Sequence, residues 1–221
     1  MSPPTLGYWK IRGLAEAIRM AFTVSKQPYT ERVFEQGEGP EFSAGEWLSV
    51  KWTLPMEVPN LPYLDLGDGQ HVSESVAILN YVCEVGGLMA KTAAGRAEVL
   101  QWVFVVREKD QSMTSACYRH PEQLADRISD VSAWLNVVIV PHMKDRHYMV
   151  GDGVTAADLV LVEMLDKLFI HSAEARNTLP TLVAHVRWFF DHFSLKPSTL
   201  PFNNKVAKVG GTVMPRPADY F

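Results

Sequence analysis

The chain has 221 residues, 47% of them hydrophobic and 21% charged, which is typical of a soluble globular protein with one large domain or two ordinary ones. Its net charge is -4 and its Lys and Arg residues are scattered, so we expect no nucleic-acid partner. No stretch approaches the ~18 apolar residues of a membrane span, and the N-terminus "MSPPTLGYW" lacks the basic and apolar regions of a signal peptide. The sequence therefore predicts a cytoplasmic protein.

The first part of the chain alternates strand and helix patterns. Thr5–Trp9 predicts a strand, and apolar residues at helical spacing follow it as far as Phe22. Tyr29–Glu35 alternates as a second strand should. Residues 62–75 contain two strand-like runs joined by Gly-Asp-Gly, which indicates an antiparallel hairpin. The serines of "SESVAIL" then suit the N-cap of a helix.

From about Thr92 the strand signals end and amphipathic helices are predicted at Ala94–Tyr118, Gln123–Lys144, Thr155–Ile170 and Pro180–Phe193. Thr155 and Asp158 have the spacing of a capping box. We therefore expect an α/β domain with a mixed sheet at residues 1–88 and an all-helical domain at 92–221, with an irregular C-terminal tail.

The two cysteines, Cys83 and Cys117, are far apart and fall inside helical patterns. This spacing excludes CxxC redox chemistry and fits no zinc site, so we expect two buried thiols and no bound metal.

Five strings, in order, carry a resemblance to a known family: "LGYWKIRGLAEAIR", "EWLSVKW", "PNLPYL", "SESVAIL" and "GDGVTAAD". They closely resemble the mu class of cytosolic glutathione S-transferases, over a match from Leu6 to roughly Phe202. The resemblance implies a thioredoxin-like N-terminal domain with a mixed four-stranded sheet, an all-α C-terminal domain and a homodimer. It also implies glutathione as co-substrate, with no other cofactor. The stretch between Phe34 and Pro62 is similar to an extended loop of that class.

In this resemblance Tyr8 falls on the catalytic tyrosine. A phenol with an ordinary pKa of ~10 is protonated at neutral pH and suits hydrogen-bond donation. The glutathione thiol starts near ~8.5, and a hydrogen bond to its charged form, worth roughly 1.5–3 kcal/mol, lowers that pKa by about one to two units. Without the surrounding match, a tyrosine at a strand end is more often a packed aromatic residue.

The resemblance implies further contacts to glutathione. Ser75 and Glu74 lie at a helix N-terminus, which favours an anion such as the γ-glutamyl carboxylate. A cis peptide before Pro62 presents the backbone of Leu61 to the cysteinyl part. The remaining residues implied are Trp47 and Lys51 for the glycyl carboxylate, together with Trp9, Asn60 and, for the partner subunit's glutathione, Glu108.

The second substrate is a small electrophile in this resemblance. The pocket residues implied are Ile11, Leu14, Arg107, Gln111, Thr114 and Tyr118, of which Tyr118 can assist electrophilically. Several of them are more polar than is usual for the class, so we expect a less hydrophobic or differently shaped electrophile.

Four positions depart from the mu pattern. Glu74 stands where Gln is usual, although a carboxylate can pair with the γ-glutamyl ammonium. Glu108 replaces an Asp, and Val58 replaces an aromatic residue of the dimer contact. Ala44 replaces a basic residue, so Lys51 and Trp47 have a larger part in holding the glycyl carboxylate.

Two alternatives stay open beside conjugation of glutathione to electrophiles in detoxification. The chain could catalyse a glutathione-dependent isomerisation or peroxide reduction on the same fold. It could also be a non-catalytic carrier or structural protein, against which the joint presence of Tyr8, Trp47, Lys51 and Ser75 argues.

Overall fold

Two units, each built from two stretches of sequence, make up the computed structural model, which describes residues 2–211 and 213–220. Unit 1 contains Met1–Gly87 and Ser198–Val213, and unit 2 contains Leu88–Pro197 and Met214–Phe221. The domain ranges expected from the sequence stay a prediction, and their end residues, Met1 and Phe221, lie outside the described residues.

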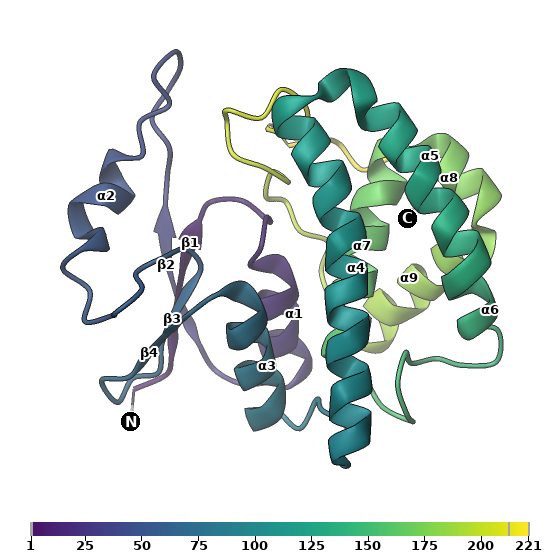
Figure 1. Cartoon of the computed structure of the whole chain (residues 1–221), viewed down its shortest axis with the longest axis horizontal. Coiled ribbons are helices and arrows are strands. Elements are labelled where there is room, and N and C mark those ends of the chain that lie inside the picture. Colours follow the sequence, from purple (N-terminus) through teal and green to yellow (C-terminus); the bar gives the residue numbers. More distant parts are fainter. Residues whose placement is uncertain (1, 212, 221) are drawn as a thin grey trace. The chain divides into compact units, whose positions relative to one another are not determined.

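Unit 1 contains a mixed four-stranded sheet in the order β2-β1-β3-β4 (Figure 1). β1 is parallel to β2 and antiparallel to β3, and β3 and β4 are antiparallel. This confirms the mixed sheet and the hairpin that the sequence predicts. The strands are β1 (Thr5–Trp9), β2 (Thr30–Phe34), β3 (Tyr63–Asp65) and β4 (His71–Ser73).

Helices lie on both faces of this sheet. Figure 1 shows α1 (Glu16–Val24) and α3 (Ser75–Val85) on one side of the sheet and α2 (Gly45–Lys51) on the other. The aromatic core on the α2 side needs a glycine in β1, because a Cβ at Gly7 would stand 2.1 Å from the ring of Tyr63. Apolar residues at helical spacing fill the other side: Ile18, Ala21, Phe22, Ile78, Leu79, Val82 and Cys83.

One expectation at α3 is wrong. The N-cap residue is Glu74, which makes no capping hydrogen bond with its side chain, and Ser75 is the first helical residue. Ser73 is the last residue of β4, one position before the N-cap, and its hydroxyl donates to the carbonyl of Val58 at 2.8 Å.

Unit 2 is all-helical, as expected. The predicted helix Gln123–Lys144 is interrupted by a π-helical turn, and the sequence missed the short helix α8. The elements are α4 (Ala93–Arg119), η1 (Pro121–Gln123), α5 (Leu124–Trp134), η2 (Leu135–Ile139), α6 (Val140–His142), α7 (Ala156–His171), α8 (Ala173–Thr178) and α9 (Pro180–His192).

α7 is the central helix of unit 2, and its residues from Ala156 to Ile170 are all buried. The predicted capping box is present: Asp158 Oδ2 accepts from the N–H and the hydroxyl of Thr155, each at 2.8 Å. Burial raises the pKa of Asp158 to about 6, although these hydrogen bonds favour its ionised form. Cys83 in unit 1 and Cys117 in unit 2 are both buried thiols, as predicted.

The chain after α9 has no helix or strand within residues 194–211 and 213–220. Its last part is fixed to unit 2 by a buried carboxylate, since Asp166 accepts from Arg216 Nη2 at 2.9 Å and from the hydroxyl of Tyr220 at 3.0 Å. Arg187 donates to the carbonyl of Tyr220 at 2.7 Å. Among the described helices, none is both long and apolar enough to cross a membrane.

Candidate active site

Tyr8 lies near the C-terminal end of the central strand β1, opposite Val33 of β2. Its side chain is buried, and its hydroxyl oxygen accepts a hydrogen bond of 2.9 Å from the backbone N–H of Leu14. Leu14 belongs to the turn between β1 and α1. The sheet and this turn therefore hold the phenol from two sides.

The turn itself is fixed by backbone hydrogen bonds. Ile11 N–H donates back to the carbonyl of Trp9 at 2.7 Å, and Gly13 has a φ of 43°, which favours glycine. The N–H groups of Arg12 and Gly13 donate to carbonyls of the C-terminal segment of unit 1, Pro201 at 2.7 Å and Phe202 at 3.0 Å. Trp9, at the end of β1, is half-buried.

Three predicted glutathione residues meet at the start of β3 and α3. The Leu61–Pro62 bond is cis, as the resemblance implies. Asn60 accepts from the N–H of Leu61 at 3.0 Å through Oδ1 and donates through Nδ2 to Glu74 Oε1 at 3.3 Å. The structure thus brings the Leu61 backbone, Asn60 and Glu74 together.

The backbone of Glu74 is strained. Its φ of 72° and ψ of 114° lie in a region that side-chain-bearing residues rarely adopt, and such a conformation costs about 1–3 kcal/mol. The Glu74 side chain is exposed, and the next residue, Ser75, is buried at the first position of α3. The free N–H groups at this helix end carry partial positive charge. A carboxylate and an anion-binding helix end therefore lie next to each other.

Trp47 and Lys51 are both on α2 and have different surroundings. Trp47 is buried, with its ring centroid 5.3 Å from that of Phe34 and 6.2 Å from that of Tyr63. The Lys51 ammonium lies 4.8 Å above the centre of the exposed Trp52 ring. Trp47 is therefore a core residue of unit 1, whereas Lys51 is half-buried and its ammonium lies beside an exposed ring.

The other predicted residues lie on α4 in unit 2. Arg107, Gln111, Thr114 and Tyr118 recur at intervals of three or four residues, which places them along one face of this helix. Glu108 is exposed and lies 3.3 Å from the ammonium of Lys109. Their part in a site stays a prediction.

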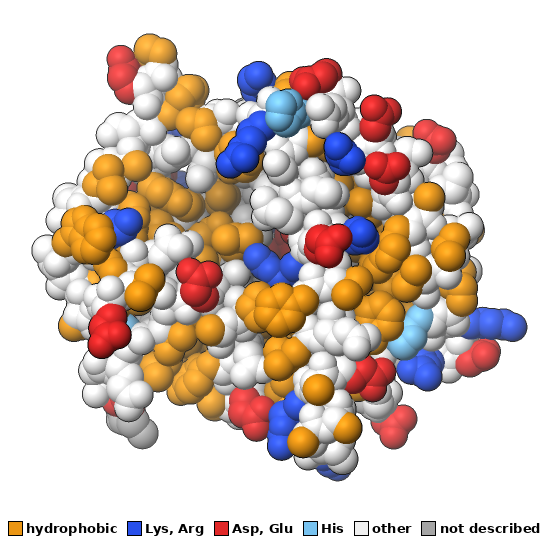
Figure 2. All heavy atoms as spheres, in the orientation of Figure 1, with side chains coloured by type: hydrophobic (Ala, Val, Ile, Leu, Met, Phe, Trp, Pro, Cys, Tyr) orange, Lys and Arg blue, Asp and Glu red, His pale blue; other side chains and the backbone are white. Residues whose placement is uncertain are grey.

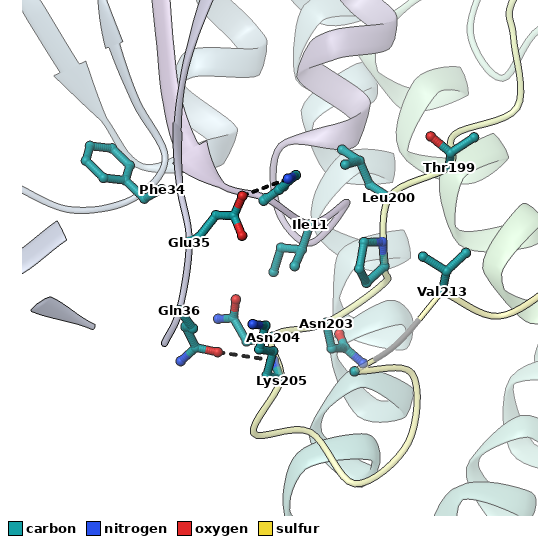
Figure 3. Close-up of a pocket in the computed structure, with 13 residues that line it drawn as sticks. Ile11, Phe34, Glu35, Gln36, Thr199, Leu200, Asn203, Asn204, Lys205 and Val213 are labelled. Carbon is teal, nitrogen blue, oxygen red and sulfur yellow. Dashed lines mark hydrogen bonds and ion pairs between the residues drawn. The ribbon is translucent and has the colours of Figure 1, made fainter. Parts of the chain in front are cut away.

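Unit 1 contains a cavity of about 350 Å³ beside the turn that follows β1 (Figure 3). Ile11 lies between two groups of residues, one from the end of β2 and one from the C-terminal segment. The described residues that line it are Lys10, Ile11, Phe34, Glu35, Gln36, Thr199, Leu200, Pro201, Asn203, Asn204, Lys205, Gly211 and Val213.

Polar groups at this cavity are held by specific partners. Gln36 Oε1 accepts from the N–H of Lys205 at 3.1 Å. The Lys10 ammonium, 2.7 Å from Glu35 Oε1, donates a hydrogen bond that keeps the pKa of the Glu35 carboxyl below its ordinary value. The sequence missed the contribution of the C-terminal segment, because its hydrogen bonds to the turn are accepted by backbone carbonyls, which leave no side-chain signature. In the described residues, no three His, Cys, Asp or Glu side chains are grouped so as to hold a metal ion.

Comparisons with known proteins agree with this architecture. The family model for the glutathione S-transferase N-terminal domain matches residues 4–84, and that for the C-terminal domain matches residues 98–197. A glutathione S-transferase of Mesocricetus auratus is 30% identical over 81% of this chain and 83% of its own. Glutathione S-transferase Mu 4 of Mus musculus is 30% identical over 85% of this chain and 86% of its own.

A solved structure shows the same fold. The crystal structure of the glutathione S-transferase Blo t 8 superimposes with a TM-score of 0.72 at 23% identity, covering 93% of this chain and 99% of that one. The thioredoxin-like N-terminal domain and helical C-terminal domain expected from the sequence are thereby confirmed. The chain belongs to the glutathione S-transferase family, and its similar relatives include several of the mu class.

Proposed function

We propose that this chain is a glutathione transferase that joins the sulfur of glutathione to small electrophiles, a reaction of the detoxification type, with Tyr8 as its catalytic residue. The observation that carries the role of Tyr8 is the hydrogen bond from Leu14 N–H to Tyr8 Oη. Hydrogen bonds in a chain polarise one another, so an oxygen that accepts from an N–H becomes a stronger O–H donor. The turn after β1 therefore prepares the phenol to donate to an anion.

The anion is the thiolate of glutathione. Donation from Tyr8 to sulfur favours the ionised thiol, whose pKa falls from ~8.5 by about one to two units, and the thiol proton passes to solvent. The sulfur then forms a bond to an electrophilic carbon. In a substitution the leaving group departs with its electron pair, and in an addition the displaced electron pair takes up a proton.

The γ-glutamyl end of glutathione fits the start of α3. Its ammonium would pair with the Glu74 carboxylate, and its carboxylate would lie at Ser75 and the free N–H groups of the helix. The N–H of Leu61 would exchange Asn60 Oδ1 for the carbonyl of the cysteinyl part. Pro62 and Trp9 complete this surface.

The glycyl carboxylate would bind Lys51. Because Trp47 is packed among aromatic rings, its part is to support α2 and to offer its indole edge.

Glu108 would reach glutathione in the partner subunit of a homodimer. Large apolar side chains on the surface of unit 1, among them Val58 and Val85, which are 64% and 60% exposed, support such a dimer. Figure 2 shows hydrophobic side chains at the surface among interspersed acidic and basic ones. We place the protein in the cytoplasm.

The cavity beside Ile11 would take part of the electrophile. That Leu14, and Arg107, Gln111, Thr114 and Tyr118 on α4, also bind the electrophile stays a prediction from the family resemblance. Its polar residues Gln36, Asn203 and Asn204 support a substrate that carries hydrogen-bonding groups. Rates with a polar epoxide and with an apolar aryl halide test this. A strong preference for the halide would contradict it.

An ultraviolet titration of bound glutathione, in the wild type and in Tyr8→Phe, tests the catalytic role. We expect a thiol pKa well below ~8.5 in the wild type, a rise of one to two units in Tyr8→Phe, and a fall of conjugation in step. If glutathione binds but its thiol pKa is unshifted and no conjugate forms, the chain is a non-catalytic carrier instead.

A further inference from the structure

Three consecutive backbone N–H groups follow Ile11, and each has a defined acceptor. Those of Arg12 and Gly13 donate to the carbonyls of Pro201 and Phe202, at 2.7 and 3.0 Å. The third, of Leu14, donates to Tyr8 Oη at 2.9 Å. The peptide stretch that delivers a hydrogen bond to the catalytic hydroxyl is therefore fixed by a segment far along the chain.

Side chains strengthen the same contact. The Arg12 guanidinium lies 4.8 Å from the centre of the Phe202 ring. Arg12 is 2% exposed and Phe202 is 4% exposed. A cation above an aromatic ring gains more when both are removed from water, so this contact is strong for its kind. It holds the Pro201 and Phe202 carbonyls at the turn.

We propose that the Arg12–Phe202 contact positions Tyr8, so that the C-terminal segment Ser198–Val213 sets how well the hydroxyl stabilises the glutathione thiolate. Arg12 and Phe202 are positioning residues and need no contact with substrate. Phe202 lies beyond both matched family regions, which end at residues 84 and 197. This inference rests on the proposed role of Tyr8.

The C-terminal segment also forms a wall of the cavity, and this role is separate from its support of the turn after β1. Among the described residues that line the cavity, Pro201 is present and Phe202 is not. Truncating Phe202 therefore tests the support of the turn and leaves the residues of that wall in place.

The experiment is a titration of the bound glutathione thiol in Phe202→Ala, in Tyr8→Phe and in the double variant. We expect Phe202→Ala alone to raise the thiol pKa by about half to one unit. The value of kcat/KM at pH 6.5 should then fall roughly two- to ninefold, and it should recover at pH 9, where the thiol is ionised without help. The KM for glutathione should change by less than about twofold. In the Tyr8→Phe background, removing Phe202 should raise the thiol pKa no further.

Val206→Ala is the matched control, because Val206 lies in the same segment, is 44% exposed and does not line the described cavity wall. It should keep the wild-type thiol pKa. Denaturant unfolding checks that each variant is folded. If Phe202→Ala is unfolded, Phe202→Leu keeps most of the buried volume without the ring and should give a smaller shift in the same direction.

The results separate this inference from the proposed function. An unchanged thiol pKa in folded Phe202→Ala or Phe202→Leu, or a rise that adds fully to that of Tyr8→Phe, overturns the positioning role. An unchanged thiol pKa in Tyr8→Phe overturns the role of Tyr8 itself.

Discussion

Gly13 lies so close to Tyr8 that a Cβ atom at residue 13 would stand 2.5 Å from the tyrosine hydroxyl oxygen. Gly13→Ala should therefore displace the phenol as well as strain a backbone with a φ of 43°. We expect the free energy of unfolding to fall by about 1–3 kcal/mol and the conjugation rate at pH 6.5 to fall at least about tenfold.

Gly69→Ala separates these two effects. Gly69 has a φ of 93°, and a Cβ there would have no described atom within 4 Å. This variant should lose stability and keep its conjugation rate. If both variants lose activity to the same extent, strain rather than displacement of Tyr8 is the cause.

Lys51→Ala should weaken glutathione binding through the glycyl carboxylate. A hydrogen bond to a charged group contributes roughly 1.5–3 kcal/mol, so we expect the KM for glutathione to rise about tenfold to a hundredfold, with kcat little changed. Steady-state kinetics with the glycyl ethyl ester of glutathione is the control, because the ester lacks this carboxylate. A variant that discriminates against the ester as strongly as the wild type would place the carboxylate elsewhere.

Glu74 combines a strained backbone with a proposed binding role, and two substitutions separate them. Glu74→Gly should raise the free energy of unfolding by about 1 kcal/mol, because relief of 1–3 kcal/mol of strain exceeds the roughly 0.5–1 kcal/mol entropic cost of glycine. Glu74→Gln keeps the strain and removes the charge, so its stability should stay near that of the wild type. Both should bind glutathione more weakly in calorimetry. Wild-type affinity in Glu74→Gln would exclude pairing with the ammonium.

His185 on α9 should make unit 2 sensitive to acid. Burial, with a smaller contribution from the charge of nearby His147, lowers the pKa of His185 to about 4 from an ordinary 6.5. Between these values the unfolded chain binds a proton that the folded one does not. The contribution of neutral His185 to the free energy of unfolding is therefore complete above pH 6.5. It is lost as the pH falls toward 4, which lowers the free energy of unfolding by up to about 3 kcal/mol.

Denaturant unfolding at several pH values measures this loss. His185→Phe should flatten the pH dependence between 6.5 and 4, whereas His120→Gln should keep the wild-type slope, because the His120 side chain is 56% exposed. An equal slope in His185→Phe and the wild type would assign the acid sensitivity to other groups.

Elements with a strong periodic pattern were predictable from the sequence. β1 begins and ends at the predicted residues, Thr5 and Trp9, and α4 differs from its prediction by one residue at each end. The capping box of α7 was predictable because it depends on two residue types at a fixed spacing, Thr155 and Asp158, which can be read from the sequence. The helix α8 was missed because its six residues make fewer than two helical turns, which is too short for a hydrophobic periodicity to be detected.

The candidate site was predictable only in part. Leu61, Asn60 and Glu74, which the family resemblance implies one by one as glutathione contacts, are joined by hydrogen bonds in the structure, and their role in binding stays a prediction. The sequence alone would have predicted a trans bond before Pro62, because most X-Pro bonds are trans. The positive φ of Glu74 could not be predicted either, because residues other than glycine rarely adopt a positive φ.

The division of unit 1 between two stretches of sequence has a consequence for the order of its synthesis. Residues 1–87 leave the ribosome long before Pro201 and Phe202, whose carbonyls accept from Arg12 and Gly13. Domains generally fold as units during translation, with the N-terminal one first. Here the sheet can form early, but the turn that carries Leu14 to Tyr8 acquires its last supports only when unit 2 has been almost completely translated. A ribosome stalled within unit 2 would therefore hold a nascent first domain whose sheet is built and whose catalytic turn is still unfinished.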